Sequence, residues 1–314
     1  MKKLLFLLLT LCFPQLCFSF TYMMVGANLS GTCSGTTYAY PCAAGCTYGF
    51  HLETSTDGAA FTNLNGTGNS DYTAPGCIAF NAIPFIYQGV YYVVYATGTT
   101  NVNIVSSTNG LNWSTVAINV LATGAVANGQ LLVNNINVVA DASNIIHITS
   151  WDGSGANWRG TNSGWWDIHA SNTNLATATW STPSHFTDVY GDNLPGLTRS
   201  GDNFTISYYN GIYYMISNYP SFYLRTSSNF LTGWSTPKSI STPWPNGYSG
   251  EVTTSFFLGT TLRMYDRPSE YASAISPYTT FGSTTRVTPT RYWPSVMPSS
   301  DLYNNATTKG SSSY

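Results

Sequence analysis

The chain has 314 residues, of which 11 are Lys or Arg and 13 are Asp or Glu, and its formal net charge is −2. Charged residues make up 8% of the chain, against about 25% in ordinary globular proteins, whereas aromatic residues make up 15%. This composition excludes a nucleic-acid-binding protein, a disordered chain and a helical bundle, and it leaves a β-rich globular protein with a large core.

Residues 1–19 have the layout of a secretory signal peptide. Two lysines precede an apolar run over residues 4–11, and small residues follow near Ser19. Pro14 interrupts the apolar stretch, which is too short to span a membrane. The sequence therefore predicts an exported protein, secreted or periplasmic, that has no membrane contact after cleavage.

Four cysteines remain after this segment, and all of them lie in the first quarter of the mature chain. An even number of cysteines in an exported chain predicts two disulfides, for which three pairings are open. A zinc site is the alternative, but no His lies at ligand spacing from them, so we expect neither a metal nor a cofactor. The disulfide candidates are Cys33, Cys42, Cys46 and Cys77.

Next along the chain, a strand, a turn residue and an aromatic or β-branched strand recur at intervals. Segments of this kind predict β-hairpins, because Gly, Asn or Asp at the turn separates two runs of good strand formers. The four copies span residues 83–95, 136–148, 206–216 and 255–265.

An aromatic residue follows each hairpin glycine at a nearly constant distance. Residues 55–61 and 107–113 match position by position as Ser-Thr-Asx-Gly-x-x-aromatic. We expect the aromatic that ends each unit to pack between neighbouring units. The spacing is 24 residues from Gly89 to Trp113, 23 from Gly211 to Trp234 and 22 from Gly259 to Phe281.

Five units of this kind fill residues 20–298, which we predict to be a single domain. A unit of about 50–60 residues has room for four short strands, as in a propeller blade. A β-sandwich does not predict the constant offset between hairpin and aromatic. The expected fold is an all-β, five-bladed β-propeller with four antiparallel strands per blade, monomeric, with a mobile tail over residues 299–314 and a binding funnel on its axis.

The repeats resemble the five-bladed propeller glycosidases of glycoside hydrolase families 43 and 32, over roughly residues 78–298. The resemblance rests on Tyr-Asn-Gly-x-Tyr-Tyr at 209–214, Ser-Thr-Asn-Gly-x-x-Trp at 107–113 and Ser-x-x-x-x-Gly-Trp at 228–234. It implies three carboxylates at the starts of the innermost strands: a base, a group that tunes the acid, and a general acid. In inverting enzymes the acid and the base stand about 6.5–9.5 Å apart.

The resemblance implies that Glu251, eight residues before Gly259, is the general acid. Asp202, Asp152 or Asp266 is the candidate base or helper, and Asp202 lies one or two residues earlier than the family pattern places an Asp. The corresponding position in another unit is Asn135, an amide that cannot serve as a base. Glu251 falls in the fifth blade if blades are counted from the N-terminus. It falls in the fourth, as in the family, if residues 20–65 instead complete the last blade.

Sugar-binding sites use aromatic rings that stack on sugar faces and polar groups that bind hydroxyls. Residues of these kinds occur in an insertion of the third unit and near two later strands. The histidines at 147, 169 and 185 are scattered in the sequence, and we expect each to be packed rather than catalytic or metal-bound. The candidate substrate-binding residues are Trp151, Asp152, Trp165, Trp166, Asp266, Arg267 and Arg291.

Two functions remain open at this point, and both have a carbohydrate as the partner. The first is an exported glycosidase that acts on a plant- or algal-type polysaccharide. The second is a non-catalytic carbohydrate-binding or adhesive propeller that lacks the catalytic base. A second carboxylate facing Glu251 across the funnel would favour the enzyme.

Overall fold

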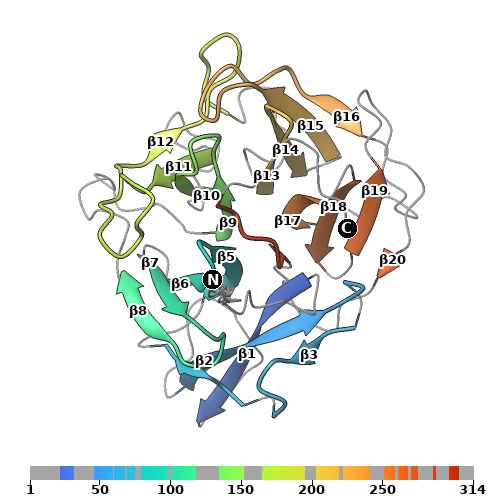
Figure 1. The fold of residues 1–314 in the computed structure, drawn as a ribbon. Coiled ribbons are helices and arrows are strands. Elements are labelled where there is room, and N and C mark those ends of the chain that lie inside the picture. The colour runs from blue at the N-terminus through green and yellow to red at the C-terminus, as the bar shows by residue number, and fades with distance from the viewer. Residues whose placement is uncertain are drawn as a thin grey trace, which may run out of the picture.

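The computed structural model of the chain forms five antiparallel β-sheets arranged in a ring (Figure 1). Each sheet is one blade, so the predicted all-β, five-bladed propeller is confirmed. No helix in the described part of the chain is long and apolar enough to cross a membrane. The structure describes residues 22–31, 46–58, 60–67, 69–74, 79–97, 101–117, 134–151, 165–194, 203–218, 222–240, 251–258, 261–267, 270–274, 286–287 and 297–303.

Four blades are continuous in sequence, and in each the first strand lies nearest the axis and the fourth at the rim (Figure 1). Blade 1 consists of β5 (Ala79–Tyr87), β6 (Val90–Thr97), β7 (Asn101–Ser107) and β8 (Ser114–Ala117). Blade 2 consists of β9 (Asn134–Ala140), β10 (Ile146–Trp151), β11 (Trp165–His169) and β12 (Ser184–His185). Blade 3 consists of β13 (Asn203–Tyr209), β14 (Ile212–Asn218), β15 (Phe222–Ser227) and β16 (Lys238–Ile240). Blade 4 consists of β17 (Glu251–Leu258), β18 (Thr261–Arg267), β19 (Glu270–Ala274) and β20 (Arg286–Val287).

Blade 5 joins the N-terminal and C-terminal ends of the described chain, because Tyr22 pairs with Pro298 and Met23 with Met297. It has five strands rather than the four that we predicted. The N-terminal strands thus complete the last blade. Of the two blade numbers that the sequence left open for Glu251, the fifth and the fourth, the structure supports the fourth. The strands are β21 (Met297–Pro298), β1 (Tyr22–Gly31), β2 (Cys46–Ser55), β3 (Thr62–Asn63) and β4 (Tyr72–Thr73), the last paired with β2.

The segment after β21 closes the ring against blade 1. Asp301 accepts hydrogen bonds from the backbone N–H groups of Gln88 (2.9 Å) and Gly89 (2.6 Å). These two residues form the β5–β6 turn with φ of 53° and 73°, the left-handed conformation that a two-residue hairpin requires. Leu302 is buried, and Tyr303 packs edge-on against Tyr87. Residues 299–303, which we expected in a mobile tail, are therefore part of the closure.

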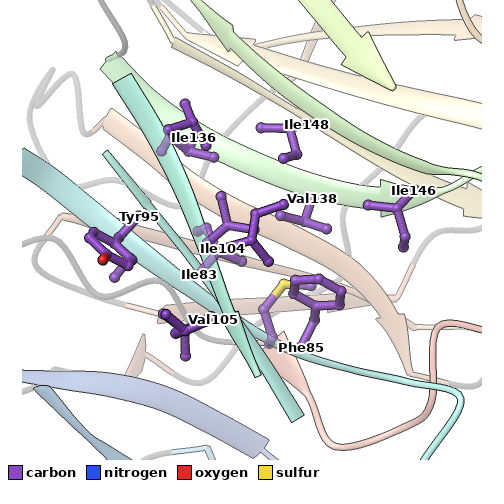
Figure 2. Close-up of a cluster of buried hydrophobic side chains, with 14 of the residues drawn as sticks. Ile83, Phe85, Tyr95, Ile104, Val105, Ile136, Val138, Ile146 and Ile148 are labelled. Atoms are coloured by element: carbon purple, nitrogen blue, oxygen red, sulfur yellow. The ribbon is translucent and has the colours of Figure 1, made fainter. Parts of the chain in front are cut away.

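The largest apolar core lies between blades 5, 1 and 2. Figure 2 shows how β5, β7 and β9 contribute branched side chains that meet in this core. The side chains of β5 from Ile83 to Tyr87 are all buried, because an innermost strand packs on a neighbouring blade with each face. Those labelled in the figure are Ile83, Phe85, Tyr95, Ile104, Val105, Ile136, Val138, Ile146 and Ile148.

Two of the aromatics that end the units, Trp113 and Trp234, pack between blades as the sequence predicted, whereas Phe281 lies outside the described residues. Trp113 of blade 1 meets Phe50 of blade 5 with ring centroids 5.3 Å apart. Trp234 of blade 3 is fully buried against Phe186 of blade 2. A single blade cannot cover its own faces, so these rings supply much of the apolar area that holds neighbouring blades together.

Burial raises the pKa of several core tyrosines, and this predicts how stability depends on alkaline pH. The pKa of Tyr91 and that of Tyr213 are each raised to about 12, and those of Tyr87 and Tyr95 are raised further. In the unfolded chain a tyrosine ionises near pH 10. The unfolded state therefore loses these protons first, and we expect the stability that they contribute to be complete below pH 10 and lost as the pH rises to about 12.

Spectrophotometric titration of tyrosinate in the native protein and in denaturant measures this directly. The native protein should show a late-titrating group of tyrosines, and urea unfolding at pH 11 should give a lower midpoint than at pH 9. If all 23 tyrosines of the folded protein titrated together near the unperturbed pKa, the expectation would be wrong.

A buried hydrogen-bonded pair, His51 and Glu53, lies over Gly26 in blade 5. His51 Nε2 is 3.1 Å from Glu53 Oε1, and the two side chains are nearly inaccessible to solvent. Gly26 is the register partner of His51, and a Cβ built on it would come within 2.7 Å of Glu53 Oε1 and closer still to the imidazole. The missing side chain of Gly26 thus leaves the space that the pair occupies.

We expect Gly26→Ala to lower the free energy of unfolding by about 1–3 kcal/mol, because the new methyl group displaces two packed, hydrogen-bonded side chains. Urea unfolding of the variant measures the loss. In the background of His51→Ala, where the space is free, the same substitution should cost clearly less. Equal losses in both backgrounds would show that the clash with His51 is not the cause.

Candidate functional site

The hairpin turns of neighbouring blades meet at one end of the axis, which we call the turn end. The Tyr87 hydroxyl donates to the carbonyl of Asn144, and the Ala142 N–H donates to the hydroxyl of Tyr213. These contacts join the turns of blades 1, 2 and 3. Tyr209 at the end of β13 stacks on Phe257 near the end of β17, at 4.6 Å.

It follows that the innermost strands β5, β9, β13 and β17 all begin at the opposite end, which we call the entry end. The segment after β21 runs parallel to β5, so β21 begins at the entry end as well. The resemblance implies that catalytic carboxylates lie at such strand starts. The starts of these strands therefore define the candidate site.

Glu251 is the first residue of β17, the innermost strand of blade 4. Its register partner on β18 is Arg267, and Val252 is the partner of Asp266. The backbone thus brings together three of the predicted site residues, Glu251, Asp266 and Arg267, on adjacent strands at the entry end.

Hydroxyl groups fix β17 against β13 below Glu251. Ser255 lies with its Oγ 2.6 Å from Ser207 Oγ and 3.2 Å from Thr205 Oγ1, and its backbone N–H donates to Thr205 at 2.9 Å. All three side chains are buried between the strands. Because these hydrogen bonds set the position of β17 within the ring, they also set the position of the strand start that carries Glu251.

Two of the other innermost strands, β9 and β13, begin with amides, whereas β5 begins with Ala79 and β21 with Met297. Asn134 and Asn135 open β9, and Asn203 opens β13. Asp202, the predicted base, is adjacent to Asn203 in sequence and lies outside the described residues. Within the described parts of the innermost strands, Glu251 is the one carboxylate at a strand start.

The two neighbouring tryptophans of the predicted sugar platform are core residues in this structure. Trp165 and Trp166 are fully buried, and Trp165 stacks on Phe204 with ring centroids 4.7 Å apart. Neither indole presents a face to solvent, so packing between blades, not stacking on a sugar, is the role the structure gives them. Trp151 pairs in register with Trp165 at the entry end of β10.

Several predicted residues lie outside the described part of the chain. These are Asp152, Arg291, Cys33, Cys42 and Cys77. Cys46 begins β2, where it is the register partner of Gly31. The predicted disulfides therefore stay a prediction.

The structure also brings together two histidines that are scattered in the sequence and that we expected only to be packed. His147 on β10 and His169 on β11 are register partners, and both approach Asp167. His147 Nδ1 lies 3.0 Å and 3.1 Å from the two carboxylate oxygens of Asp167, and His169 Nδ1 lies 3.1 Å from Oδ2. The sequence signal was the alternation Asp167-x-His169, which puts two side chains on one face of a strand. The partner on the next strand could not be found without the register.

Two carboxylates, Asp141 and Asp167, lie close to the imidazole of His147. Burial by itself lowers the pKa of His147, but hydrogen bonds and charge from Asp141 and Asp167 outweigh it and raise the pKa to about 9. His147 and backbone N–H groups in turn lower the pKa of Asp141, against the effect of its burial. This cluster lies near the turn end of blade 2, so it is separate from Glu251.

No family model and no curated protein matches the sequence. Solved structures match in fold. An α-L-arabinofuranosidase of glycoside hydrolase family 43 from Clostridium thermocellum aligns over 84% of this chain and 90% of its own, with a TM-score of 0.55 and 12% identity. The RS223 β-xylosidase aligns over 90% and 89%, with a TM-score of 0.51 and 10% identity.

A family 43 arabinoxylan arabinofuranohydrolase from Bacillus subtilis, solved in complex with cellotetraose, aligns over 81% of this chain and 57% of its own, with a TM-score of 0.50 and 12% identity. Sequence identities this low establish the architecture alone. The chain therefore shares the five-bladed propeller fold of the glycoside hydrolase family 43 enzymes, over most of its length.

Proposed function

We propose that this protein is an exported, glycosidase-like propeller that acts on a polysaccharide, with Glu251 as its general acid. The observation that carries the proposal is the place of Glu251, at the start of the innermost strand of blade 4. Propeller enzymes bind ligands where the innermost strands meet on the axis, and a glycosidase needs a carboxylic acid there to protonate the leaving oxygen.

The other two glutamates of the chain are poorer candidates for that role. Glu53 is buried in blade 5 beside His51 and belongs to the contact with Gly26. Glu270 begins β19, two strands further from the axis. Elimination within the chain thus supports the same residue that the resemblance implies.

In the proposed site Asp202 serves as the base, and Asp266 and Arg267 serve as polar neighbours. Asp202 is one position from Asn203, the first residue of the neighbouring innermost strand. An inverting mechanism requires about 6.5–9.5 Å between the two carboxyl groups, so that a water molecule fits between the base and the sugar. We propose a plant- or algal-type polysaccharide as the substrate, furanose-containing, in keeping with the arabinofuranosidase name of one structure that shares the fold.

A second function is favoured by the amides at the starts of β9 and β13. Asn134, Asn135 and Asn203 stand where carboxylates would activate water, and an amide has no basic site for that proton. If Asp202 does not act as the base, the protein is a non-catalytic carbohydrate-binding or adhesive propeller.

A paired assay separates the two functions. Reducing-sugar release is measured on arabinan, arabinoxylan, xylan and an algal polysaccharide, for the wild type beside Glu251→Gln, and retention is measured on the same glycans in affinity gels. Release that collapses in the variant supports the glycosidase. Retention without release supports the binding protein. Release that Glu251→Gln leaves unchanged would overturn the assignment of the acid.

We further propose that residues 1–19 are removed on export and that Cys33, Cys42, Cys46 and Cys77 form two disulfides. N-terminal sequencing of the mature protein tests the first point. Mass spectrometry of tryptic peptides with and without reduction tests the second and identifies the pairing.

A further inference from the structure

We propose that His147, Asp167 and His169 bind a divalent transition-metal ion, Zn²⁺ before all others, at the turn end of blade 2. Each residue offers one ligand atom, and the ligand atoms lie within 4.8 Å of one another. Two imidazoles and a carboxylate are a donor set that suits Zn²⁺ and related ions. The site is distinct from the proposed catalytic site in position and in chemistry.

The distances within the cluster fit a shared ion. Each imidazole Nδ1 lies 3.0–3.1 Å from a carboxylate oxygen of Asp167. Two ligands that each stand about 2.0–2.1 Å from one Zn²⁺, at angles between a right angle and the tetrahedral angle, are separated by roughly 2.9–3.4 Å. All three ligand atoms lie within 4.8 Å of one another, so an ion would draw the two imidazoles together by side-chain movement on strands that already hold them in register.

The surroundings of His147 match those of a metal-bound imidazole. Its second nitrogen, Nε2, faces the carboxylate of Asp141, with Oδ2 at 3.5 Å. A metal-ligating histidine commonly presents its other N–H to a carboxylate, which fixes the ring and makes it a stronger ligand. The Phe230 ring of blade 3, with its centroid 3.9 Å from that of the imidazole, covers His147 on the side of the next blade.

The charges also favour a cation. Two carboxylates flank the His147 ring: the fully buried Asp167 at Nδ1 and Asp141 at Nε2. A divalent ion on two neutral imidazoles would balance both carboxylates, a role that protonated His147 fills in the metal-free protein. His169 is about one-third exposed, with 34% of its side chain accessible, so water can reach the ion and supply a fourth ligand.

The ion would tie β10 to β11 and hold His147 against Phe230, and it would thereby stabilise the contact between blades 2 and 3. Because binding is to the folded state, the protein should gain stability with the concentration of free metal. At about 100 times Kd, the thermal midpoint should rise by about 5–10 °C.

The test uses the purified full chain, stripped with EDTA and titrated with ZnCl₂ by calorimetry, with thermal unfolding as a second readout. We expect one ion per chain. His169→Gln, at the most exposed of the three ligands, should weaken binding by about 10–100-fold or more and abolish the thermal shift. His185→Gln is the matched control, because His185 lies on the same blade outside the cluster, and it should bind like the wild type.

Titration with Co²⁺ separates this site from the cysteines. Nitrogen and oxygen ligands give visible d–d bands without the near-ultraviolet sulfur-to-cobalt charge transfer that cysteine ligation produces. A charge-transfer band, binding that survives His169→Gln, or no binding with no thermal shift would each overturn the proposal. In the last case the cluster is a hydrogen-bonded ion-pair network. None of these readouts depends on catalytic activity, so the result does not bear on Glu251.

Discussion

Replacing Glu251 with Gln should lower kcat on the responsive polysaccharide by about 10²–10⁴-fold, the usual contribution of a general acid. Gln has nearly the same shape as Glu but no proton to give to the glycosidic oxygen. The loss should therefore fall mainly on kcat, whereas KM and retention on the same glycan change little. Steady-state reducing-sugar kinetics and affinity gels measure the two quantities separately.

The leaving group gives a sharper form of this test. An aryl glycoside with a good leaving group needs little protonation, so Glu251→Gln should lose much less activity on dinitrophenyl arabinofuranoside than on the polysaccharide. A loss of equal size on both substrates would indicate that Glu251 acts in another way. Glu270→Gln is the matched control, because Glu270 is on the same blade but on its third strand, and it should retain full activity.

Ending the chain at Ser295 or Val296 should prevent stable folding, because it removes the strand that closes the ring. The truncation deletes β21, which pairs with β1, and with it the buried side chains of Met297 and Leu302. Each buried apolar side chain of this size contributes about 1.5–3 kcal/mol. Together with the lost hydrogen bonds, the sum approaches the whole stability of a typical domain, about 5–15 kcal/mol.

A chain that ends at Tyr303 is the matched control for this truncation. It retains β21, Asp301 and the contact of Tyr303 with Tyr87, so its thermal midpoint should equal that of the full chain. Asp301→Ala tests one part of the closure. It leaves the N–H groups of Gln88 and Gly89 without their acceptor and should cost about 1–3 kcal/mol in urea unfolding. Normal folding of the chain without β21 would show that the ring does not need this closure.

The sequence was sufficient for features that depend on neighbours along the chain. The hairpin predicted over residues 83–95 lies within β5 and β6, and the one over residues 206–216 lies within β13 and β14. Their turns use Gln88-Gly89 and Asn210-Gly211 in the left-handed conformation. Turn chemistry and strand alternation act over a few residues, so repeats of them were enough to predict the blades and their number.

The candidate acid was also within reach of the sequence. Its position relative to the hairpin glycine is again a local spacing, and the structure places Glu251 at the start of an innermost strand. The role of Trp165 and Trp166 could not be predicted from the sequence. An aromatic residue in an insertion is equally suited to a sugar platform and to a core. Only the tertiary packing buries these two rings, Trp165 against blade 3 and Trp166 in the core between blades 5, 1 and 2.

The sequence by itself thus determined the repeating blade and the spacing of Glu251, whereas the tertiary structure decided which distant residues meet. Tyr22 pairs with Pro298, almost the whole chain away in sequence. This pairing makes the N-terminal strands part of the last blade, so the blade that Glu251 opens is the fourth. The register of β10 on β11 brings His147 and His169 to one carboxylate. Contacts of this kind depend on ring closure and strand register, which result from burying the faces of all five blades together and leave no local pattern in the sequence.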